Sequence, residues 1–419
     1  MAINKRDMGE ALDRVAEAAA KLGLPLYATH FELVDGHTLS QLAAYGGMPS
    51  RYRHWSFGKL YGHYQAAYHF RRSRIYELVV NHEPAYAFVD RSLDLGSCLV
   101  VAAHVLAHVA YFRSHAAFEA TSRDEVGVMA EHRRILERYS RRFGRRQVEK
   151  FIDAGLVLAD FTAESPRMRN IGESQDDVLG FLATSAPHLH PWQLHVLRVL
   201  HQEARYFWPQ QLTKVGNEGY ATFWHRRILH ALDPRPEEII AIARLNAELV
   251  QVTSPQLNPY RLGYVLVNAA YEQEGDQGLI RVARDFSDAT LVREYLDEPR
   301  ARLAGVLPGK DRSWSKAKQR LLDDLDHAGI PRLRVDRQRS RPKGILHLKH
   351  QHTGRDLDMH MLPHALSLIA EELWPGGVEL TTLYRNTWHR FCHDGREFRD
   401  EIANDSVGLA MDGKEVGND

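Results

Sequence analysis

The sequence predicts a mainly α-helical protein with a helical N-terminal domain over residues 1–300, a small α+β domain over 301–400 and a loose acidic tail over 401–419. Three observations lead to this prediction. Apolar residues recur at helical spacing through most of the first 300 residues. Beyond that point, short apolar runs alternate with Pro and Gly turns, a pattern typical of strands. The 419 residues, 44% of them hydrophobic and 26% charged, suffice for two or three domains with buried cores.

The N-terminal domain is expected to begin with an amphipathic helix over 2–22, where Met8, Leu12 and Val15 recur at helical spacing. Residues 24–58 are rich in turn-forming residues and are expected to be irregular. Helices are then expected over 60–81, 95–118, 123–142, 145–155, 173–184, 191–206, 211–231, 236–249, 261–273 and 276–283.

The C-terminal domain is expected to open with a helix over 315–327. Short strands are expected at 332–335, 344–350 and 357–361, each bounded by turn residues. A helix over 362–374 should end at Pro375-Gly376-Gly377, and a last strand should follow at 378–384.

Composition excludes several classes of protein. Lys plus Arg equals Asp plus Glu at 54 each, so attraction of the whole chain to nucleic acid or to an anionic membrane is disfavoured, although local basic patches stay open. Two cysteines, Cys98 and Cys392, exclude a disulfide framework and a Cys-rich zinc site, and they favour the reducing cytoplasm. The most apolar window, 98–112, is too short to span a bilayer, and the N-terminus lacks the apolar core of a signal peptide.

Histidine is unusually frequent, with 24 residues, and one pair stands out. His104 and His108 are four residues apart on a predicted helix, so they share one face about 6 Å apart and can bind one metal ion. This is the ligand spacing of the H-E-x-x-H helix of zincins, but Val105 stands where the zincin general base would be. The alternative is a pair of core histidines bonded to backbone or carboxylate groups.

A second predicted helix carries Glu218, Thr222 and His225 on one polar face beside Phe223 and Trp224. A buried carboxylate needs a cation or a donor, and an ion bound by the two histidines would satisfy Glu218. The small residues beside Glu218 would let another helix approach. His225 is about 10 Å further along the helix, so it is not assigned to the ion but to support of the ligands, to proton transfer or to substrate contact. The alternative is a buried Glu–His or Glu–Arg pair without metal.

Several longer motifs occur in a fixed order and carry a family resemblance: RHWSFGK at 53–59, IYELVVN at 75–81, PAYAF at 84–88, the paired histidines, NEGYATFWH at 217–225 and NPYRLG at 258–263. This series resembles the SpoVR family, the stage V sporulation protein R-like proteins, from about Thr29 to about Thr382. The family often has Gly where this chain has Ala107. The resemblance implies a link to spore cortex formation or to a stress response, and it implies a serine protein kinase and a von Willebrand A-like protein as partners.

The remaining site assignments are hypotheses. Glu77 is expected in the middle of an apolar helix, where burial would raise its pKa and suit it to act as the acid or base that Val105 cannot supply. The alternative is a Glu on a helix face, paired with Arg74 or another Arg. His54, Asn217 and Tyr220 are assigned to substrate binding. The alternative for His54 is a cap on a turn against an aromatic ring.

The basic run 131–150 suggests a solvated helix face. A second basic run, 332–343, suggests a local contact with an acidic partner or nucleic acid. This second run has no interleaved aromatic residue, so nucleic acid is not favoured. There is no nucleophile elbow, P-loop or dinucleotide motif.

The sequence therefore predicts a cytoplasmic protein in which His104, His108 and Glu218 bind a divalent metal, expected to be zinc, and Glu77 and His225 act in catalysis. A metal-dependent hydrolase acting on an amide, in a peptide or a cell-wall precursor, is the first hypothesis. The alternative is a non-enzymatic scaffold with a structural metal or a polar core that works with a kinase-linked partner.

Overall fold

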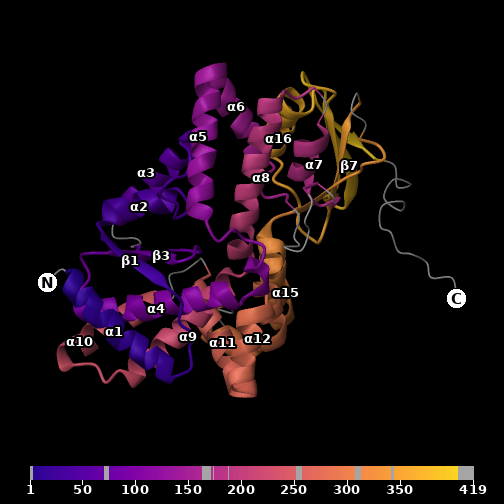
Figure 1. The fold of residues 1–419 in the computed structure, drawn as a ribbon. Coiled ribbons are helices and arrows are strands. Elements are labelled where there is room, and N and C mark those ends of the chain that lie inside the picture. Colours follow the sequence, from indigo (N-terminus) through magenta and orange to yellow (C-terminus); the bar gives the residue numbers. More distant parts are fainter. Residues whose placement is uncertain are drawn as a thin grey trace. The chain divides into compact units, whose positions relative to one another are not determined.

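The computed structural model describes residues 3–69, 75–162, 171–172, 174–186, 188–251, 257–306, 313–340 and 344–403. It confirms the predicted fold class, a mainly helical chain with a small α+β part near the C-terminus (Figure 1). The chain forms two compact units, residues 1–134 with 209–326 and residues 135–208 with 327–419. These units differ from the expected division near residue 300, because helices from 135–208 pack with the C-terminal strands and helix.

The first unit is built mainly from helices. Its elements are α1 (Lys5–Lys21), α2 (Gly36–Ala44), α3 (Trp55–His69), α4 (Leu95–Ser114), the 3₁₀ turn η1 (Ala116–Phe118), α9 (Lys214–Ala231), α10 (Pro236–Leu249), α11 (Pro259–Glu274), α12 (Asp276–Asp285), α13 (Asp288–Tyr295), α14 (Glu298–Leu303) and α15 (Trp314–Leu325). Helix α5 (Glu125–Phe143) is divided between the two units. Most of these helices lie within a few residues of the predicted ranges.

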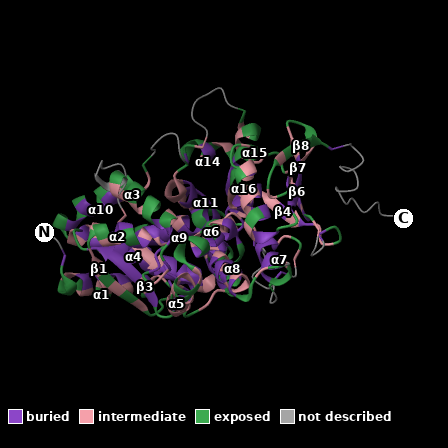
Figure 2. Cartoon of the chain, turned by 90° about the horizontal axis from the view of Figure 1, so that it is seen from above, coloured by how far each residue is buried: buried purple, intermediate pink, exposed green. Residues whose placement is uncertain are grey.

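Helix α4 is the central helix of this unit. It is apolar on all sides and buried along almost its whole length (Figure 2), and it packs against α1, α9 and α10. It is long and apolar enough to cross a membrane, but 89% of the relevant window is buried inside the unit. Its first turn is capped by the carboxylate of Asp94, which accepts a hydrogen bond from the amide of Ser97 at 2.8 Å. The long apolar run is therefore a core helix.

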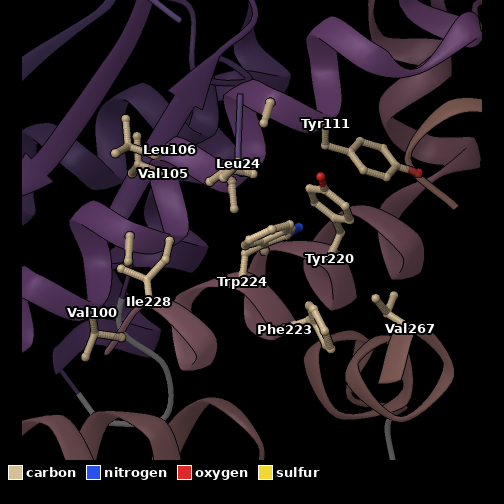
Figure 3. Packing of buried hydrophobic residues seen from close by; sticks show 14 of the residues in the cluster. Leu24, Val100, Val105, Leu106, Tyr111, Tyr220, Phe223, Trp224, Ile228 and Val267 are labelled. Carbon is tan, nitrogen blue, oxygen red and sulfur yellow. The ribbon is translucent and has the colours of Figure 1, made fainter. Parts of the chain in front are cut away.

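Helix α9 packs closely against both α4 and α11. A Cβ atom on Gly219 would lie 2.2 Å from the backbone carbon of Gly263 in α11, so only glycine allows the two backbones to meet here. On the side toward α4, Tyr220 of α9 faces Tyr111 of α4 with ring centroids 5.6 Å apart (Figure 3). This close approach, expected from the small residues beside Glu218, fixes the position of α9 along its own axis relative to α4 and α11.

The first unit also contains a sheet that the sequence did not predict. Strand β3 (Ala85–Asp90) lies between β1 (Thr29–Val34) and β2 (Glu77–Val80), parallel to β1 and antiparallel to β2. The expected irregular segment 24–58 therefore contains a strand and the helix α2, and the expected helix over 60–81 is wrong beyond α3.

The location of Glu77 is corrected by this sheet. Glu77 begins strand β2, opposite Val89 of β3, and does not lie in the middle of a helix. The run Leu78-Val79-Val80 contains β-branched residues, which suit a short pleated strand. Arg74, the alternative partner of Glu77, lies outside the described residues.

The second unit packs helices onto a five-stranded sheet. Its helices are α6 (Arg145–Leu156), α7 (Val178–Ser185), α8 (Pro191–Leu212) up to Trp208, and α16 (Leu362–Leu368), which continues as one π-helical turn, η3 (Ile369–Leu373). The sheet order is β4 (Arg332–Val335), β5 (Leu346–Gln351), β6 (Val378–Tyr384), β7 (Thr387–His393) and β8 (Phe398–Ile402). Only the β5–β6 pair is parallel, because α16 forms the crossover between these strands.

Three predictions for this C-terminal region need correction. The expected strand at 357–361 is a turn that leads into α16, and β6 is followed by two further strands. Residues 401–402 of the expected loose tail belong to β8, and residues 404–419 lie outside the described residues.

Candidate metal centre

The first two residues of the candidate centre come from α4. His104 and His108 lie one helical turn apart, and their ring centroids are separated by 4.5 Å at an interplanar angle of 87°. Both side chains are buried. Because α4 is buried on all sides, these rings lie inside the unit and must satisfy their nitrogen atoms with protein groups or with an ion.

The third residue, Glu218, comes from the first part of α9. The carboxylate of Asp288 accepts hydrogen bonds from the amides of Val215 and Gly216, both at 2.8 Å, and thereby fixes the first turn of α9. Gly219, the next residue after Glu218, lies against Gly263 of α11. These contacts on two sides determine where the Glu218 side chain leaves the helix.

The three side chains converge on a single point. The Nε2 atoms of His104 and His108 each lie 3.4 Å from the Oε2 atom of Glu218. All three ligand atoms lie within 4.8 Å of one another, and the group is the one such cluster of His, Cys, Asp or Glu found among the described residues. Two ligands bonded at 2.0–2.1 Å to a tetrahedral zinc are separated by roughly 3.3 Å. The two 3.4 Å separations match that value.

The other ring nitrogens of both histidines are also engaged. His108 Nδ1 lies 2.8 Å from Asn217 Oδ1, and His104 Nδ1 lies 3.0 Å from His225 Nδ1. His225 Nε2 in turn lies 2.7 Å from Asn246 Oδ1 in α10. The network therefore extends from α4 through α9 to α10.

The amide oxygens fix which nitrogens carry protons. An oxygen only accepts, so His108 donates from Nδ1 to Asn217, and His225 donates from Nε2 to Asn246. Burial and the neighbouring His104 lower the pKa of His225 well below its ordinary value, so His225 is neutral and its Nδ1 accepts from His104 Nδ1. In a neutral His104 the Nε2 atom then carries the lone pair on the side of Glu218 and can bind an ion, whereas a protonated Nε2 donates to Glu218 Oε2 at 3.4 Å.

The electrostatics of the centre require a positive charge beside Glu218. Burial opposes the charge of Glu218, but its interactions with His104 and His108 outweigh burial and hold the pKa of this carboxyl well below its usual range. Burial likewise opposes a charge on His108, yet Glu218 above all raises the pKa of His108. Burial and His108 lower the pKa of His104. The ionised Glu218 can be balanced in two ways, by a proton on His108 or by a bound cation.

Glu77 lies beside this cluster. Its Oε1 atom is 4.0 Å from His104 Nε2, and its side chain is 12% exposed, compared with 17% for Glu218 and 2% for His104. Burial, aided by the charge of Glu218, raises the pKa of Glu77 to about 7. The structure therefore brings Glu77 beside the cluster, although from a strand and not from the predicted helix.

The other assigned residues lie elsewhere. His225 and Asn217 contact the rear nitrogens of the two histidines, where they orient the rings. Tyr220 packs between Tyr111 and Trp224 in the hydrophobic core (Figure 3). His54 lies at the start of α3, against Trp55 and Phe57, with Nδ1 2.8 Å from Ser56 Oγ.

Two residues of the centre were missed. Asn246 in α10 completes the network behind His104, and Tyr260 in α11 stacks on the His104 ring with centroids 5.8 Å apart. Tyr260 belongs to the NPYRLG motif, and that motif was the available signal. Asn246 offered no local signal, because its role depends on how α10 packs against α4.

Other histidine, cysteine and arginine side chains make contacts within the fold. His115 ends α4 and bonds to the backbone oxygen of Phe286, and the thiol of Cys98 lies against Met8 in the core. In the basic run 332–343, Arg337 donates to the backbone oxygens of Gly172 and Ser174, and Arg339 donates to Glu379. Two of these cations are thus used within the second unit, and 341–343 lie outside the described residues.

Comparison with known proteins places the chain in a family. The family model described as SpoVR like protein matches residues 3–172 and 159–302. The chain therefore belongs to the SpoVR family, as the motifs indicated. It is similar to the uncharacterized protein YcgB of Escherichia coli strain K12, with 25% identity over 313 residues. The match covers 61% of this chain and 61% of that relative. No solved structure matches the chain significantly.

Proposed function

We propose that this SpoVR-family protein is a metal-dependent hydrolase that cleaves an amide bond, with His104, His108 and Glu218 as ligands of a divalent ion, zinc by preference. The observation that carries this proposal is the convergence of two Nε2 atoms on Glu218 Oε2 at 3.4 Å each, with both Nδ1 atoms held from behind. A His₂Glu set is one of the ligand sets of catalytic zinc, where a fourth position stays open.

The chemistry divides between the ion and the protein. A divalent ion held by His104, His108 and Glu218 would supply Lewis acidity and would activate water as a nucleophile. Glu77 is the group available as general base, because its carboxylate lies 4.0 Å from His104 Nε2 and its pKa of about 7 suits proton transfer near neutral pH. His225 keeps His104 in the ligand tautomer.

The substrate class follows from the family and not from the geometry of the centre. The link of the SpoVR name to sporulation favours an amide in a peptide or a cell-wall precursor, in the cytoplasm. The proposal also includes a role in sporulation or in a stress response. It further includes a serine protein kinase and a von Willebrand A-like protein as partners.

One observation favours a second function, a non-enzymatic scaffold. His108 has a raised pKa beside the ionised Glu218, so a protonated His108 can balance the carboxylate without any ion. Val105 also stands at the position of the zincin base. In that case the cluster is a polar core, and the protein acts through its partners.

The proposal is tested by loading the full chain with Zn²⁺ and assaying a panel of peptide and muropeptide amides. We expect turnover that is lost in Glu77→Gln while zinc remains bound, because Glu77 is a base and not a ligand. Glu32→Gln, an exchange in strand β1 of the same unit, is the matched control. Turnover that persists in Glu77→Gln contradicts the assigned base. Zinc held by four protein ligands without turnover supports the scaffold.

A further inference from the structure

Strand β2, which carries Glu77, is an edge strand. The sheet order is β1-β3-β2, so in the described part of the chain β2 pairs with β3 alone and its other side is a free edge. Glu77 Oε1 lies 4.0 Å from His104 Nε2, so this edge strand adjoins the candidate centre. The N–H and C=O groups along the free edge of a strand can pair with a further extended chain.

The register of the sheet determines which residues of β2 face this free edge. The amide of Asp90 donates to the backbone oxygen of Tyr76 at 3.0 Å, so these two residues form a hydrogen-bonded pair. Bonded and non-bonded pairs alternate along two antiparallel strands, and Glu77 and Val79 therefore occupy the non-bonded positions. The backbone N–H and C=O groups of Glu77 and Val79 thus point away from β3.

The pairing of β3 with β1 supports this assignment. Ala85, the first residue of β3, donates its amide to the backbone oxygen of Ala28, which precedes β1, at 3.0 Å. The odd-numbered residues of β3 therefore bond to β1, which leaves the even-numbered residues for β2. Among the described residues, no other backbone group forms a hydrogen bond with the N–H or C=O of Glu77 or Val79.

The same alternation directs the side chain of Glu77 toward α4. Glu77 and Val79 share one face of the sheet with Ala87 and Val89, which are fully buried, and both β2 and β3 pack against α4. A chain added to the free edge runs about 4.8 Å from β2. One residue of that chain therefore lies directly beside Glu77, whose carboxylate faces the candidate centre.

We propose that the free edge of β2 binds the substrate as an added strand, and that the substrate is therefore an extended peptide. This inference rests on the proposed hydrolase function and decides between its two substrate classes. A peptide of α-linked residues presents backbone groups at every second residue that match those of Glu77 and Val79. The stem of a cell-wall precursor, with its D-residues and γ-linkage, does not keep this repeat.

The experiment compares two probes on the zinc-loaded full-length protein. N-acetyl-trialanine hydroxamate is an extended peptide that ends in a metal-binding group, and acetohydroxamate is that group without the peptide. We expect the peptide probe to bind about 10-fold more tightly, because one or two added hydrogen bonds contribute that much. N-methylation of one alanine at a time should weaken binding only at alternate positions, since only alternate residues of an added strand face β2.

Proline substitutions test the same edge from the side of the protein. Val79→Pro removes an N–H that faces the free edge and leaves the bonds to β3 in place, so it should abolish the advantage of the peptide probe. Leu33→Pro is the matched control, because the N–H of Leu33 faces away from β3 on the other edge strand, β1. This variant should keep the advantage.

The possible outcomes separate this inference from the metal proposal. A protein that binds neither hydroxamate contradicts the metal centre itself. Equal affinity for the two probes, or the same loss from N-methylation at every position, overturns only the binding of a strand to β2. The methylated probes give this answer with the wild type even if Val79→Pro fails to fold. Cleavage of muropeptide amides but of no α-linked peptide would contradict the assigned substrate class.

Discussion

The two units each bury a histidine–carboxylate cluster, and the clusters differ in where the carboxylate finds its donors. In the second unit, Asp177 accepts from the amides of Gly172 and Gly180 at 2.8 and 3.0 Å, and His201 Nε2 lies 3.0 Å from both of its oxygens. Both side chains are 2% exposed. Every oxygen of Asp177 therefore has a donor from the protein.

The cluster of the first unit is arranged differently. Glu218 Oε2 faces the Nε2 atoms of two histidines whose Nδ1 atoms point away from it into other hydrogen bonds. Neutral imidazoles in this arrangement present lone pairs to an anion, which is unfavourable unless a cation lies between them. The comparison teaches that buried histidine and carboxylate alone do not indicate a metal site. What distinguishes the first cluster is that both Nδ1 atoms are engaged elsewhere, so that both Nε2 atoms face Glu218.

The largest difference between the clusters should appear in metal binding. Glu218→Gln keeps the shape of the side chain but removes a charged ligand, so we expect the affinity for Zn²⁺ to fall by on the order of 100-fold or more. Asp177→Asn, the matched change in the second unit, should leave affinity unchanged. Competition with a chromophoric chelator measures both. Equal loss in the two variants would mean that metal binding reports only general stability.

Metal affinity should depend on the cluster of the first unit, whereas the free energy of unfolding should respond to loss of the carboxylate in the second. Asp177→Ala leaves His201 and the amides of Gly172 and Gly180 without their acceptor, so we expect the free energy of unfolding to fall by about 3–5 kcal/mol. Denaturant titration of the metal-free protein gives the value. A loss below about 1 kcal/mol would show that water replaces the carboxylate and that the cluster is not closed as described.

The two clusters should also differ in how they make the stability of the metal-free protein depend on pH. The pKa of Glu77 rises from 4.5 to about 7 on folding, so between these values the folded protein retains a proton that the unfolded chain has lost. The contribution of Glu77 to stability is therefore present below pH 4.5 and is lost as the pH rises through about 7, by at most about 3 kcal/mol.

Glu77→Gln should remove that pH dependence, because glutamine does not titrate. The difference in unfolding free energy between wild type and variant, followed from pH 4.5 to 8, measures the effect. The pKa of Asp177 is shifted the other way, below its ordinary 3.8, so its contribution is present above that pH and is lost only in acid. A flat difference curve for Glu77→Gln would contradict the burial of an ionisable Glu77 beside Glu218.

The smallest effect is expected for a substitution at the Nδ1 side of the histidines, away from Glu218. His225→Ala removes the acceptor for His104 Nδ1, so the ring loses its fixed tautomer, and we expect zinc affinity to fall about 10–100-fold. His195→Ala in the second unit is the control; its Nδ1 bonds to Tyr139. Isothermal titration with Zn²⁺ reports both. Affinity that stays at the wild-type level in His225→Ala would show that the orientation of His104 does not depend on this contact.

The sequence predicted the parts of the fold and candidate site that depend on local patterns. The long apolar run of α4 and the mixed polar and apolar pattern of α9 predicted these helices closely, and the four-residue spacing placed His104 beside His108. The first sheet was missed because its strands have only four to six residues and lie between helices, so their pattern is ambiguous. That error placed Glu77 in the wrong element.

Local sequence patterns could not predict the network of contacts around the centre. Glu218 was selected from its polar face, and the structure brings it to both histidines, but the roles of Asn246 and Tyr260 depend on the packing of α10 and α11. Likewise, the assignment of Tyr220 to substrate binding did not anticipate that it faces Tyr111, on another side of α9 from Glu218. A helix places residues of one stripe together, but only tertiary packing decides what each stripe meets.

Metal content tests the central claim most directly. Elemental analysis of the purified full-length protein, after supplementation with zinc, manganese or iron, should give about one divalent ion per chain, and His104→Ala should lose it while remaining folded. The Asp177→Asn protein should retain the ion. A wild type that holds no metal under any of these conditions would contradict the account, and His104, His108 and Glu218 would then form a core cluster held by a proton on His108.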